Sequence, residues 1–540
     1  MRDTNKEGHA IWRGALILTV SAFLVKIMSA AYRLPYQNLA GDVGFYAYQQ
    51  VYPFYAIAVT LGGTGFPIVI SKFIAEAKNG GGYRQEAQIR RHALIALFIL
   101  CGLFFCLLFL FAVPLTKVMG DVRLSSLVRI AAFIYLFVPL IAVLRGNFQG
   151  ENENMMPTAL SQIGEQALRV LLIIGSSWYL FLHHGNPYQF GRAATIGSVA
   201  APAASLIILS FYFRKEKSPF VRTAKGAPGR IDWHLVKDLL ISGCLFSLLA
   251  LPLVSFQLID SLTVIPLLNH AHVPDPRTEN GIYDRAYALT QFGIIAAASL
   301  TATIVPGLAK LSALRQKREV QRQASLALKI SLAFGLAAAA GLAVIGREVN
   351  IMLFKNAAGT VSFSLGAFTM LTLSLILASS GILEATGRPW LPFLYLAAGG
   401  AAKLAGNYLL IPLFSINGAA AATCLATALT AWLNIRCLRR RSLAEALRFR
   451  LILKLCAAAS GMVVAVLFWK RLIAIWESRL ADSRLFATGV ALSGALVGAC
   501  VFLILILILR YFDSGDFERL PLIGRRLHKK DLSEKSKISE

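Results

Sequence analysis

Residues 11–72 contain two apolar segments, each long enough to cross a lipid bilayer, and a short polar turn at residues 35–44 joins them. A hydrocarbon core of about 30 Å needs roughly 20 helical residues, and both segments reach that length. Because the bilayer core offers no water to backbone N–H and C=O groups, apolar segments of this length span it as helices. The chain therefore opens with a pair of membrane-spanning helices.

Apolar segments of similar length recur along all 540 residues, 56% of which are hydrophobic. This composition is too apolar for an ordinary soluble protein. We predict an all-α polytopic membrane protein with about fourteen transmembrane helices. The expected helices lie near residues 11–34, 46–71, 92–113, 124–148, 157–182, 190–213, 236–260, 286–309, 325–345, 361–386, 390–412, 417–436, 451–473 and 484–510.

The chain has a weak internal repeat. Residues 65–72 end the second expected helix much as residues 303–310 end the eighth, and prolines open both the fifth and the eleventh, an offset of about 235–240 residues. Six helices per repeat give both halves the same orientation, which predicts two parallel six-helix lobes. The predicted organisation is an N-terminal lobe at 1–213, a basic cytoplasmic linker at 214–235, a C-terminal lobe at 236–436, an extra helix pair at 437–511 and a cytoplasmic tail at 512–540.

The formal net charge is +26, from 54 Lys and Arg against 28 Asp and Glu. The cations gather in alternate connectors, whereas the connectors at 35–45 and 413–416 are short and nearly free of them. This asymmetry is the pattern of the positive-inside rule, and it indicates membrane topology rather than nucleic-acid binding. We expect a multi-pass protein of the cell membrane with both termini in the cytoplasm. The basic connectors lie at residues 72–91, 214–230, 310–322 and 436–450.

Signatures of enzymes and cofactors are missing from the sequence. Its seven cysteines lie singly, without metal-ligand or redox spacing, and the histidine pair His270 and His272 is too weak a signal for a metal site. A membrane transferase would need clustered carboxylates or an intramembrane histidine, and there is no P-loop. We expect no enzyme activity, no cofactor and no metal. Without a P-loop, any transport by this chain has to be driven by an ion gradient, the membrane potential or the substrate gradient.

The first two expected helices contain polar residues, which inside a membrane usually serve a function or a partner. Lys26 and Arg33 are spaced to project from one helix face, which suggests a cationic internal chamber. Snorkelling of either side chain to the outer surface is the alternative. In the second helix, Gln49 is a further candidate, and the glycine-rich residues 62–67 should interrupt regular helix.

Later helices carry further candidates. Glu165 and Arg169 lie four residues apart and are expected to pair, either as a structural salt bridge or as a coupling element. Lys403 and Asn407 either line the second lobe or hydrogen-bond between helices. Asp260 and Arg285 flank an expected outer loop at residues 261–285 and are candidates for a mutual pair. The predicted substrate-binding residues are Lys26, Arg33, Gln49, Arg169, Arg285, Lys403 and Asn407.

Four groups of residues, in order along the first twelve expected helices, carry a family likeness. They are residues 41–46 with 65–76, residues 145–150 with 156–166, residues 281–283 with Pro306, and Lys403, Asn407 and Leu410 with residues 418–423. Together they resemble the multidrug/oligosaccharidyl-lipid/polysaccharide exporter superfamily, and within it the polysaccharide-biosynthesis branch that holds the lipid II flippases and stage V sporulation protein B. The second helix departs from some members, because glutamines and aromatic residues replace arginines.

The resemblance implies a two-lobed flippase that works by alternating access on an undecaprenyl-pyrophosphate-linked saccharide, either peptidoglycan lipid II or a polysaccharide precursor. It also implies a chamber lined by basic residues and a groove for the lipid tail at the extra helix pair. An anionic pyrophosphate needs such a cationic, desolvated chamber, so the charges agree with this function.

Two alternatives remain open. The first is a cation-coupled multidrug exporter, for which acidic midplane residues are expected. The second is a non-transporting scaffold for cell-wall synthesis, which would have no use for buried charges. Expected partners are the lipid-linked saccharide, membrane lipids and cell-wall synthesis proteins, without nucleic acid, and we expect a monomer.

Overall fold

The computed structural model describes residues 17–18, 20–80, 82–150, 155–215, 231–444, 448–475 and 483–513. Every regular element in these ranges is a helix and none is a strand, which confirms the all-α prediction. The predicted linker at 214–235 and the predicted tail at 512–540 fall mostly outside the described residues.

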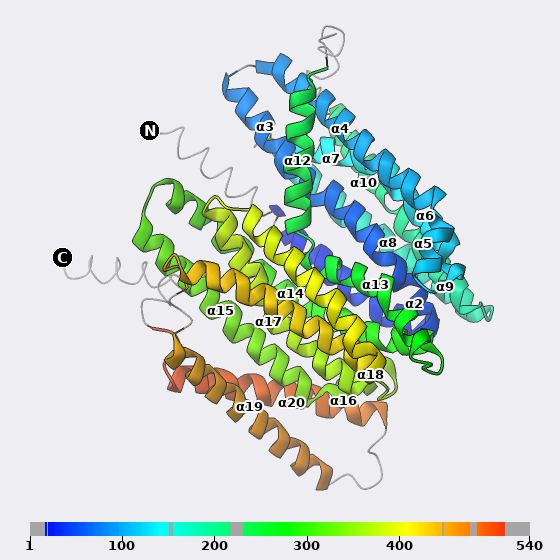
Figure 1. The fold of residues 1–540 in the computed structure, drawn as a ribbon, viewed down its shortest axis with the longest axis vertical. Coiled ribbons are helices and arrows are strands. Elements are labelled where there is room, and N and C mark those ends of the chain that lie inside the picture. The colour runs from blue at the N-terminus through cyan, green and yellow to red at the C-terminus, as the bar shows by residue number, and fades with distance from the viewer. Residues whose placement is uncertain are drawn as a thin grey trace, which may run out of the picture.

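The first bundle, blue to cyan in Figure 1, begins with a helix that is described from residue 20 to residue 31. After it come α2 (Arg33–Thr60), the π-helical segment η1 (Leu61–Gly65), α3 (Phe66–Gly80), α4 (Gly82–Leu110), α5 (Ala112–Val118), η2 (Val122–Leu124), α6 (Ser125–Ala132), η3 (Phe133–Leu136), α7 (Val138–Gly150), α8 (Met156–Leu182), α9 (Pro187–Ala200) and α10 (Pro202–Lys215).

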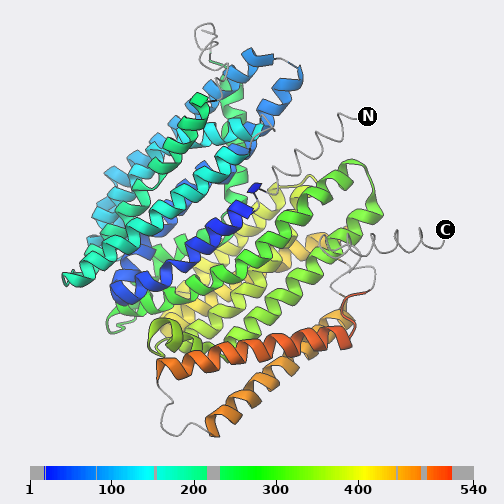
Figure 2. The ribbon, with the colours of Figure 1, turned by 180° about the vertical axis from the view of Figure 1, so that it is seen from behind.

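The second bundle, green to yellow, lies beside the first in both views (Figures 1 and 2). The chain reaches it through α12 (Trp233–Leu249), which still packs on the first bundle. The second bundle then consists of α13 (Pro252–His270), α14 (Pro276–Ala313), α15 (Lys317–Val344), α16 (Gly346–Phe354), α17 (Thr360–Ala385) and α18 (Trp390–Arg439). The helices α19 (Phe449–Ile475) and α20 (Arg484–Ile508) pack on each other and on the outside of this bundle, through α15 and α16. They form the extra pair that the sequence predicts.

Ten helical stretches of the described chain are long and apolar enough to cross a membrane. Two of them, Val20–Ala77 and Trp390–Arg439, have 58 and 50 residues, and at 1.5 Å per residue each exceeds roughly 70 Å, enough for two crossings. Both are bent by a residue with left-handed φ, Gly41 at 68° and Ser415 at 51°. Each therefore corresponds to two expected helices, while the total of fourteen stays a prediction.

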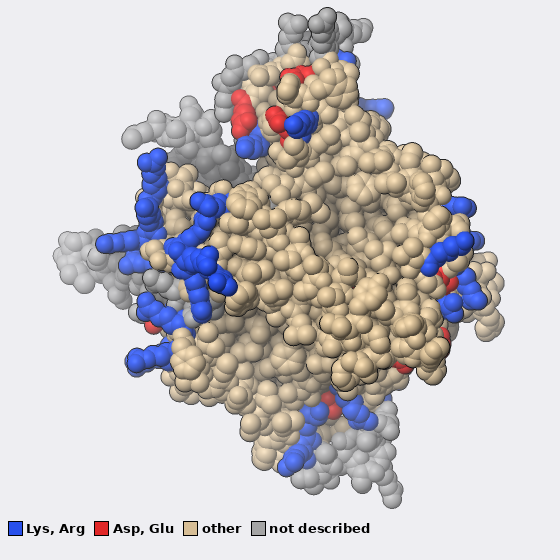
Figure 3. All heavy atoms as spheres, in the orientation of Figure 1, with Lys and Arg blue, Asp and Glu red and all other residues tan. Residues whose placement is uncertain are grey.

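The surface agrees with a membrane protein. One face of the molecule shows a broad band without charges, and Lys and Arg gather at the ends of the helices (Figure 3). An uncharged band of this kind fits the hydrocarbon core, and the basic ends fit the interfaces.

The interruption expected at residues 62–67 is present as the π-helical segment η1 between α2 and α3. Such segments are rare and disturb the regular hydrogen-bond ladder of a helix. Gly65 in η1 lies directly against α12, because a Cβ atom there would lie 1.7 Å from Ser247 Oγ. Only glycine permits this close approach of two backbones.

The helix expected at residues 236–260 is divided before Pro252. Its first half, α12, packs on α3 and α4, with Val236 and Leu239 in the core of the first bundle, whereas α13 packs on α18 and α2. The structure thus places the change of bundle at Pro252 rather than at residue 236. The expected loop at 261–285 is mostly helical, because α13 continues to His270 and α14 begins at Pro276.

Candidate functional site

Polar contacts join the two bundles at the ends away from the basic connectors, which we call the outer end. Arg285 of α14 holds Asp42 of α2 through Nη2–Oδ2 and Nη2–Oδ1 distances of 2.7 Å. A second pair links Arg277 Nε to Asp121 Oδ2 at 2.9 Å. In addition, Asn38 Nδ2 donates to the Leu353 carbonyl at 2.9 Å. These contacts hold the outer ends of the bundles together.

The expected pair between Asp260 and Arg285 is therefore wrong. Both residues lie inside helices and not beside a loop, and each finds a different partner. Asp260 Oδ1 is 2.7 Å from Lys403 Nζ, which also donates to the Ala419 carbonyl at 3.0 Å and to Thr423 Oγ1 at 2.5 Å. Since Lys403 is 0% exposed, it is fully desolvated, and its charge is balanced by Asp260.

Asn407 extends this network between α18 and α13. Its Nδ2 donates to Asp260 Oδ1 at 2.9 Å and to Thr263 Oγ1 at 2.8 Å. Tyr283 and Tyr287 of α14 donate to the other carboxylate oxygen of Asp260. Lys403 and Asn407 thus form interhelical hydrogen bonds, which is one of the two expected alternatives, and Asp260 is the centre of the network.

The expected pair between Glu165 and Arg169 is also wrong. Glu165 Oε2 lies 2.8 Å from Arg145 Nη2 of α7. Arg145 further donates to Ser205 at 2.8 Å, to Ser161 at 3.1 Å and to the Gly62 carbonyl of η1 at 3.4 Å. The cation that pairs with Glu165 therefore comes from α7 and not from its own helix, α8. Arg169 of α8 makes other contacts.

Arg169 enters a group of aromatic side chains that we call the tyrosine cluster, Tyr32, Tyr48, Tyr52 and Tyr55. Its Nη2 donates to the Tyr48 hydroxyl at 2.6 Å and to the Tyr32 hydroxyl at 2.8 Å. Its guanidinium also lies 4.3 Å from the centroid of the Tyr55 ring. Arg169 is thus held by neutral hydroxyls and ring faces, with no carboxylate among its described partners.

Arg33 reaches the same cluster from the start of α2. Its side chain is 1% exposed, so the snorkelling alternative is wrong for this residue. The guanidinium lies 4.5 Å over the Tyr52 ring, and none of its three nitrogens has a hydrogen-bond partner among the described residues. The nearby Asp284 carboxylate interacts with it electrostatically, and Asp284 Oδ2 is likewise buried without a hydrogen bond.

More buried polar atoms without hydrogen-bond partners lie on α2, α13 and α14, helices that pack against one another across the two bundles. A buried polar group without a partner costs about 1–3 kcal/mol, so a group of them needs a functional or solvent explanation. Gln49 of α2, a predicted site residue, belongs to this set. The buried atoms without described partners on α2, α13 and α14 belong to Arg33, Gln37, Asn38, Gln49, Gln50, Gln257, Asn280 and Asp284.

Lys26 occupies a different environment from Arg33. It lies in the helix described from residue 20 to residue 31 and is exposed, whereas Arg33 is buried. The backbone stays helical through Tyr32, whose N–H donates to the Met28 carbonyl, so the two cations differ in burial rather than in helical spacing. Lys403 is also buried and paired, and in this conformation Lys26 and Lys403 do not form a common exposed site.

Several important residues were not among the predicted site residues. Asp42 and Arg145 lie in the stretches that carry the family likeness, which could have identified them. Tyr48, Tyr52 and Tyr55 recur at helical spacing on α2, a pattern that predicts a common face. Asp284 had no such signal.

Among the described residues, no group of His, Cys, Asp or Glu is arranged to hold a metal ion.

Comparisons with known proteins agree with this architecture. A family model described as polysaccharide biosynthesis protein matches residues 11–312. The uncharacterized membrane protein YabM of Bacillus subtilis (strain 168) is 35% identical over 523 residues, covering 96% of each chain. Stage V sporulation protein B of the same organism is 25% identical and covers 95% of this chain and 98% of its own length. Its lipid II flippase MurJ is 23% identical, with 91% and 94% covered.

Two solved structures share the fold. The inward closed conformation of a lipid II flippase MurJ superposes with a TM-score of 0.62 at 14% identity, covering 92% of this chain and 99% of that one. An inward-facing multidrug resistance transporter of the MATE family superposes with a TM-score of 0.64 at 15% identity, covering 79% and 98%.

Proposed function

Because the chain belongs to the polysaccharide biosynthesis protein family of the multidrug/oligosaccharidyl-lipid/polysaccharide exporter superfamily, we propose that it flips an undecaprenyl-pyrophosphate-linked saccharide across the cytoplasmic membrane. The saccharide is peptidoglycan lipid II or a polysaccharide precursor, since relatives named as lipid II flippase and stage V sporulation protein B align along almost the whole chain.

The observation that carries this proposal is the buried, unpaired guanidinium of Arg33. A cation in a desolvated site without a hydrogen-bonded anion is costly, and a phosphate oxygen would relieve that cost. Charge-assisted hydrogen bonds contribute about 1.5–3 kcal/mol each. Gln49 and other buried amides of α2, the helix that begins at Arg33, also have atoms without described partners and would offer further contacts to a polar headgroup.

In the proposed mechanism the headgroup enters from the cytoplasmic side, because the described contacts between the bundles close the outer end. Lys26, being exposed, attracts the pyrophosphate along this approach, and Arg33 receives it. Separation of Asp42 from Arg285 and of Asp121 from Arg277 then opens the outer end. Lys403 and Asn407 keep the second bundle rigid during this movement through their bonds to Asp260.

Three further properties are part of the proposal. Both termini lie in the cytoplasm, the protein acts as a monomer, and cell-wall synthesis proteins receive or supply its substrate. The positive-inside distribution of charge supports the first of these.

A cation-coupled multidrug exporter is the second candidate. The buried Asp284 carboxylate, which has an unpaired oxygen, favours it, because a desolvated carboxylate can receive a proton or an organic cation. Two other buried acids of the described residues, Glu165 and Asp260, are already paired with Arg145 and Lys403. The buried cation Arg33 therefore supports an anionic substrate more strongly than Asp284 supports a cationic one.

The test is flipping of a fluorescent polyprenyl-pyrophosphate saccharide by purified protein in proteoliposomes. Arg33→Gln should lower the rate about tenfold or more, because one charge-assisted contact of about 1.4 kcal/mol or more is lost. Arg192→Gln is the matched control, since Arg192 is an exposed arginine of the same bundle. Equal rates for the two variants would contradict the proposal, and binding of organic cations that Asp284→Asn abolishes would favour the exporter.

A further inference from the structure

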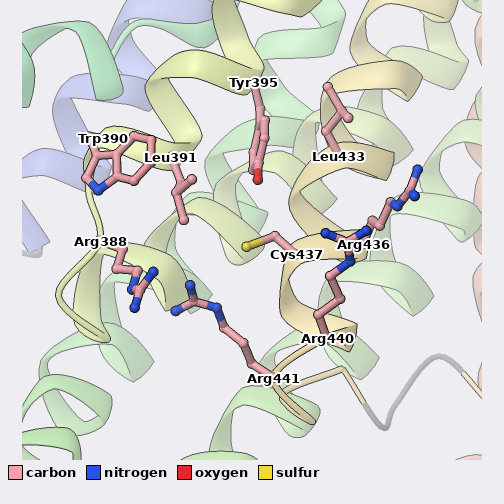
Figure 4. A pocket seen from close by; sticks show the side chains of 9 residues that line it. All are labelled: Arg388, Trp390, Leu391, Tyr395, Leu433, Arg436, Cys437, Arg440 and Arg441. Atoms are coloured by element: carbon pink, nitrogen blue, oxygen red, sulfur yellow. The ribbon is translucent and has the colours of Figure 1, made fainter.

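A pocket of about 530 Å³ opens at the basic end of the second bundle. It forms where the turn between α17 and α18 meets the last two turns of α18 (Figure 4). Both ends of α18 reach this place because the helix reverses at Ser415. The lining residues are Arg388, Trp390, Leu391, Tyr395, Leu433, Arg436, Cys437, Arg440 and Arg441.

The pocket combines four arginines with an apolar and aromatic wall. Arg388 and Arg441 extend toward each other from opposite sides of the pocket (Figure 4). Arg436 lies over the Trp432 ring at 5.1 Å. No described carboxylate forms a salt bridge with any of the four arginines. Converging like charges repel one another, so this arrangement favours an anion between them.

The surroundings of the pocket indicate where the anion comes from. Trp390 and Leu394 are 50% exposed and Trp432 is 51% exposed, so large apolar side chains flank the arginines on the surface. Tryptophan beside arginine is typical of the membrane interface, where headgroups meet acyl chains. Basic pockets at the cytoplasmic ends of transmembrane helices are suited to anionic lipid headgroups.

We propose that this pocket binds the phosphate headgroup of an anionic membrane phospholipid. Arg388 and Arg441 bind the phosphate oxygens from two sides, while Trp390 and Leu394 contact the part of the acyl chains that lies next to the headgroup. Such a lipid would fasten the α17–α18 turn to the end of α18. The residues that line the pocket do not include Arg33 or the buried polar residues of α2, so we assign the lipid as a structural or regulatory ligand and not as the transported substrate.

The experiment measures lipid binding to the purified full chain by native mass spectrometry. Wild-type protein should bind phosphatidylglycerol about tenfold more tightly than phosphatidylcholine, and Arg388→Gln with Arg441→Gln should remove that preference. The matched control is Arg318→Gln with Arg450→Gln, which removes two exposed cations from the same side of the membrane but outside the pocket. The control should keep the preference within about twofold. If the double variant folds poorly, the single variants Arg388→Gln and Arg441→Gln are measured instead.

Competition identifies the source of the phosphate. Added inorganic phosphate should not displace phosphatidylglycerol at equal concentration, and undecaprenyl pyrophosphate should not be preferred over it. Unchanged phosphatidylglycerol binding by the Arg388 and Arg441 variants, or equal binding of the two phospholipids, would overturn the proposal. Displacement by inorganic phosphate would show a site for the free ion, and a preference for undecaprenyl pyrophosphate would show a substrate site.

Discussion

Arg285 and Asp42, which are 243 residues apart in the chain, form a forked ion pair in which one guanidinium nitrogen lies 2.7 Å from each carboxylate oxygen. Arg285 Nε adds a third contact at 3.0 Å. The arginine belongs to α14 and the aspartate to α2, so this pair links the two bundles directly at the outer end. The bundles cannot separate there while it is intact.

We predict that Asp42→Asn loosens the outer end. Removing one partner of a buried ion pair lowers the stability by about 3–5 kcal/mol. Because the Asp42 side chain is 17% exposed, we expect a destabilisation of about 3 kcal/mol for this pair. A cysteine at Asn280, which is buried near Asp42, should then react about tenfold faster with an impermeant thiol reagent added from outside, in a background without other cysteines. Asp275→Asn is the control, since among the described residues the Asp275 carboxylate accepts a hydrogen bond only from nearby Thr278. Equal labelling in both variants would contradict a closed outer end.

A second prediction distinguishes the partner of Glu165. Glu165→Gln leaves Arg145 as an uncompensated buried cation and should lower the amount of folded protein in the membrane. Exchange of the charges, Glu165→Arg with Arg145→Glu, should restore part of the loss, whereas Glu165→Arg with Arg169→Glu should not. Abundance is measured by blotting of membranes and by size-exclusion chromatography. Rescue by the Arg169 exchange alone would show that the pair lies within α8.

The third prediction concerns Lys403. Since Lys403 is buried and paired with Asp260, Lys403→Met should destabilise the second bundle by about 3 kcal/mol or more. Lys403→Met with Asp260→Asn removes both charges and keeps an acceptor for Asn407, so most of the stability should return. Thermal unfolding of the purified variants measures this. Normal stability of Lys403→Met together with lost flipping would instead assign Lys403 to substrate binding.

The fourth prediction is the topology. Cysteines placed in the connectors 214–230 and 436–450 should be protected from an impermeant thiol reagent on intact cells, because these connectors are the basic ones. A cysteine at residue 272, between α13 and α14, should be labelled. Labelling of the 214–230 connector from outside would reverse the orientation of the whole protein.

The sequence by itself determined the architecture. Apolar segments of bilayer length, separated by polar connectors, specify an all-helical membrane protein, since the bilayer requires each segment to satisfy its own backbone hydrogen bonds. The interruption at residues 62–67 and the extra pair α19 and α20 were predictable for the same reason, because glycine content and hydropathy act locally. The presence of buried charge was predictable as well, from Arg33, Glu165 and Lys403 within apolar runs.

Only the tertiary structure decided which charges meet. Spacing within one helix suggested Arg169 as the partner of Glu165, but α7 brings Arg145 closer, and the same is true of Asp260 with Lys403 and of Arg285 with Asp42. These choices depend on the rotation and tilt of helices that are far apart in the chain. A buried charge takes the partner with the best geometry and the least exposure to water, and no local pattern encodes that geometry. For the same reason the sequence could not show that Arg33 is enclosed by the tyrosine cluster while Lys26, seven residues earlier, is exposed.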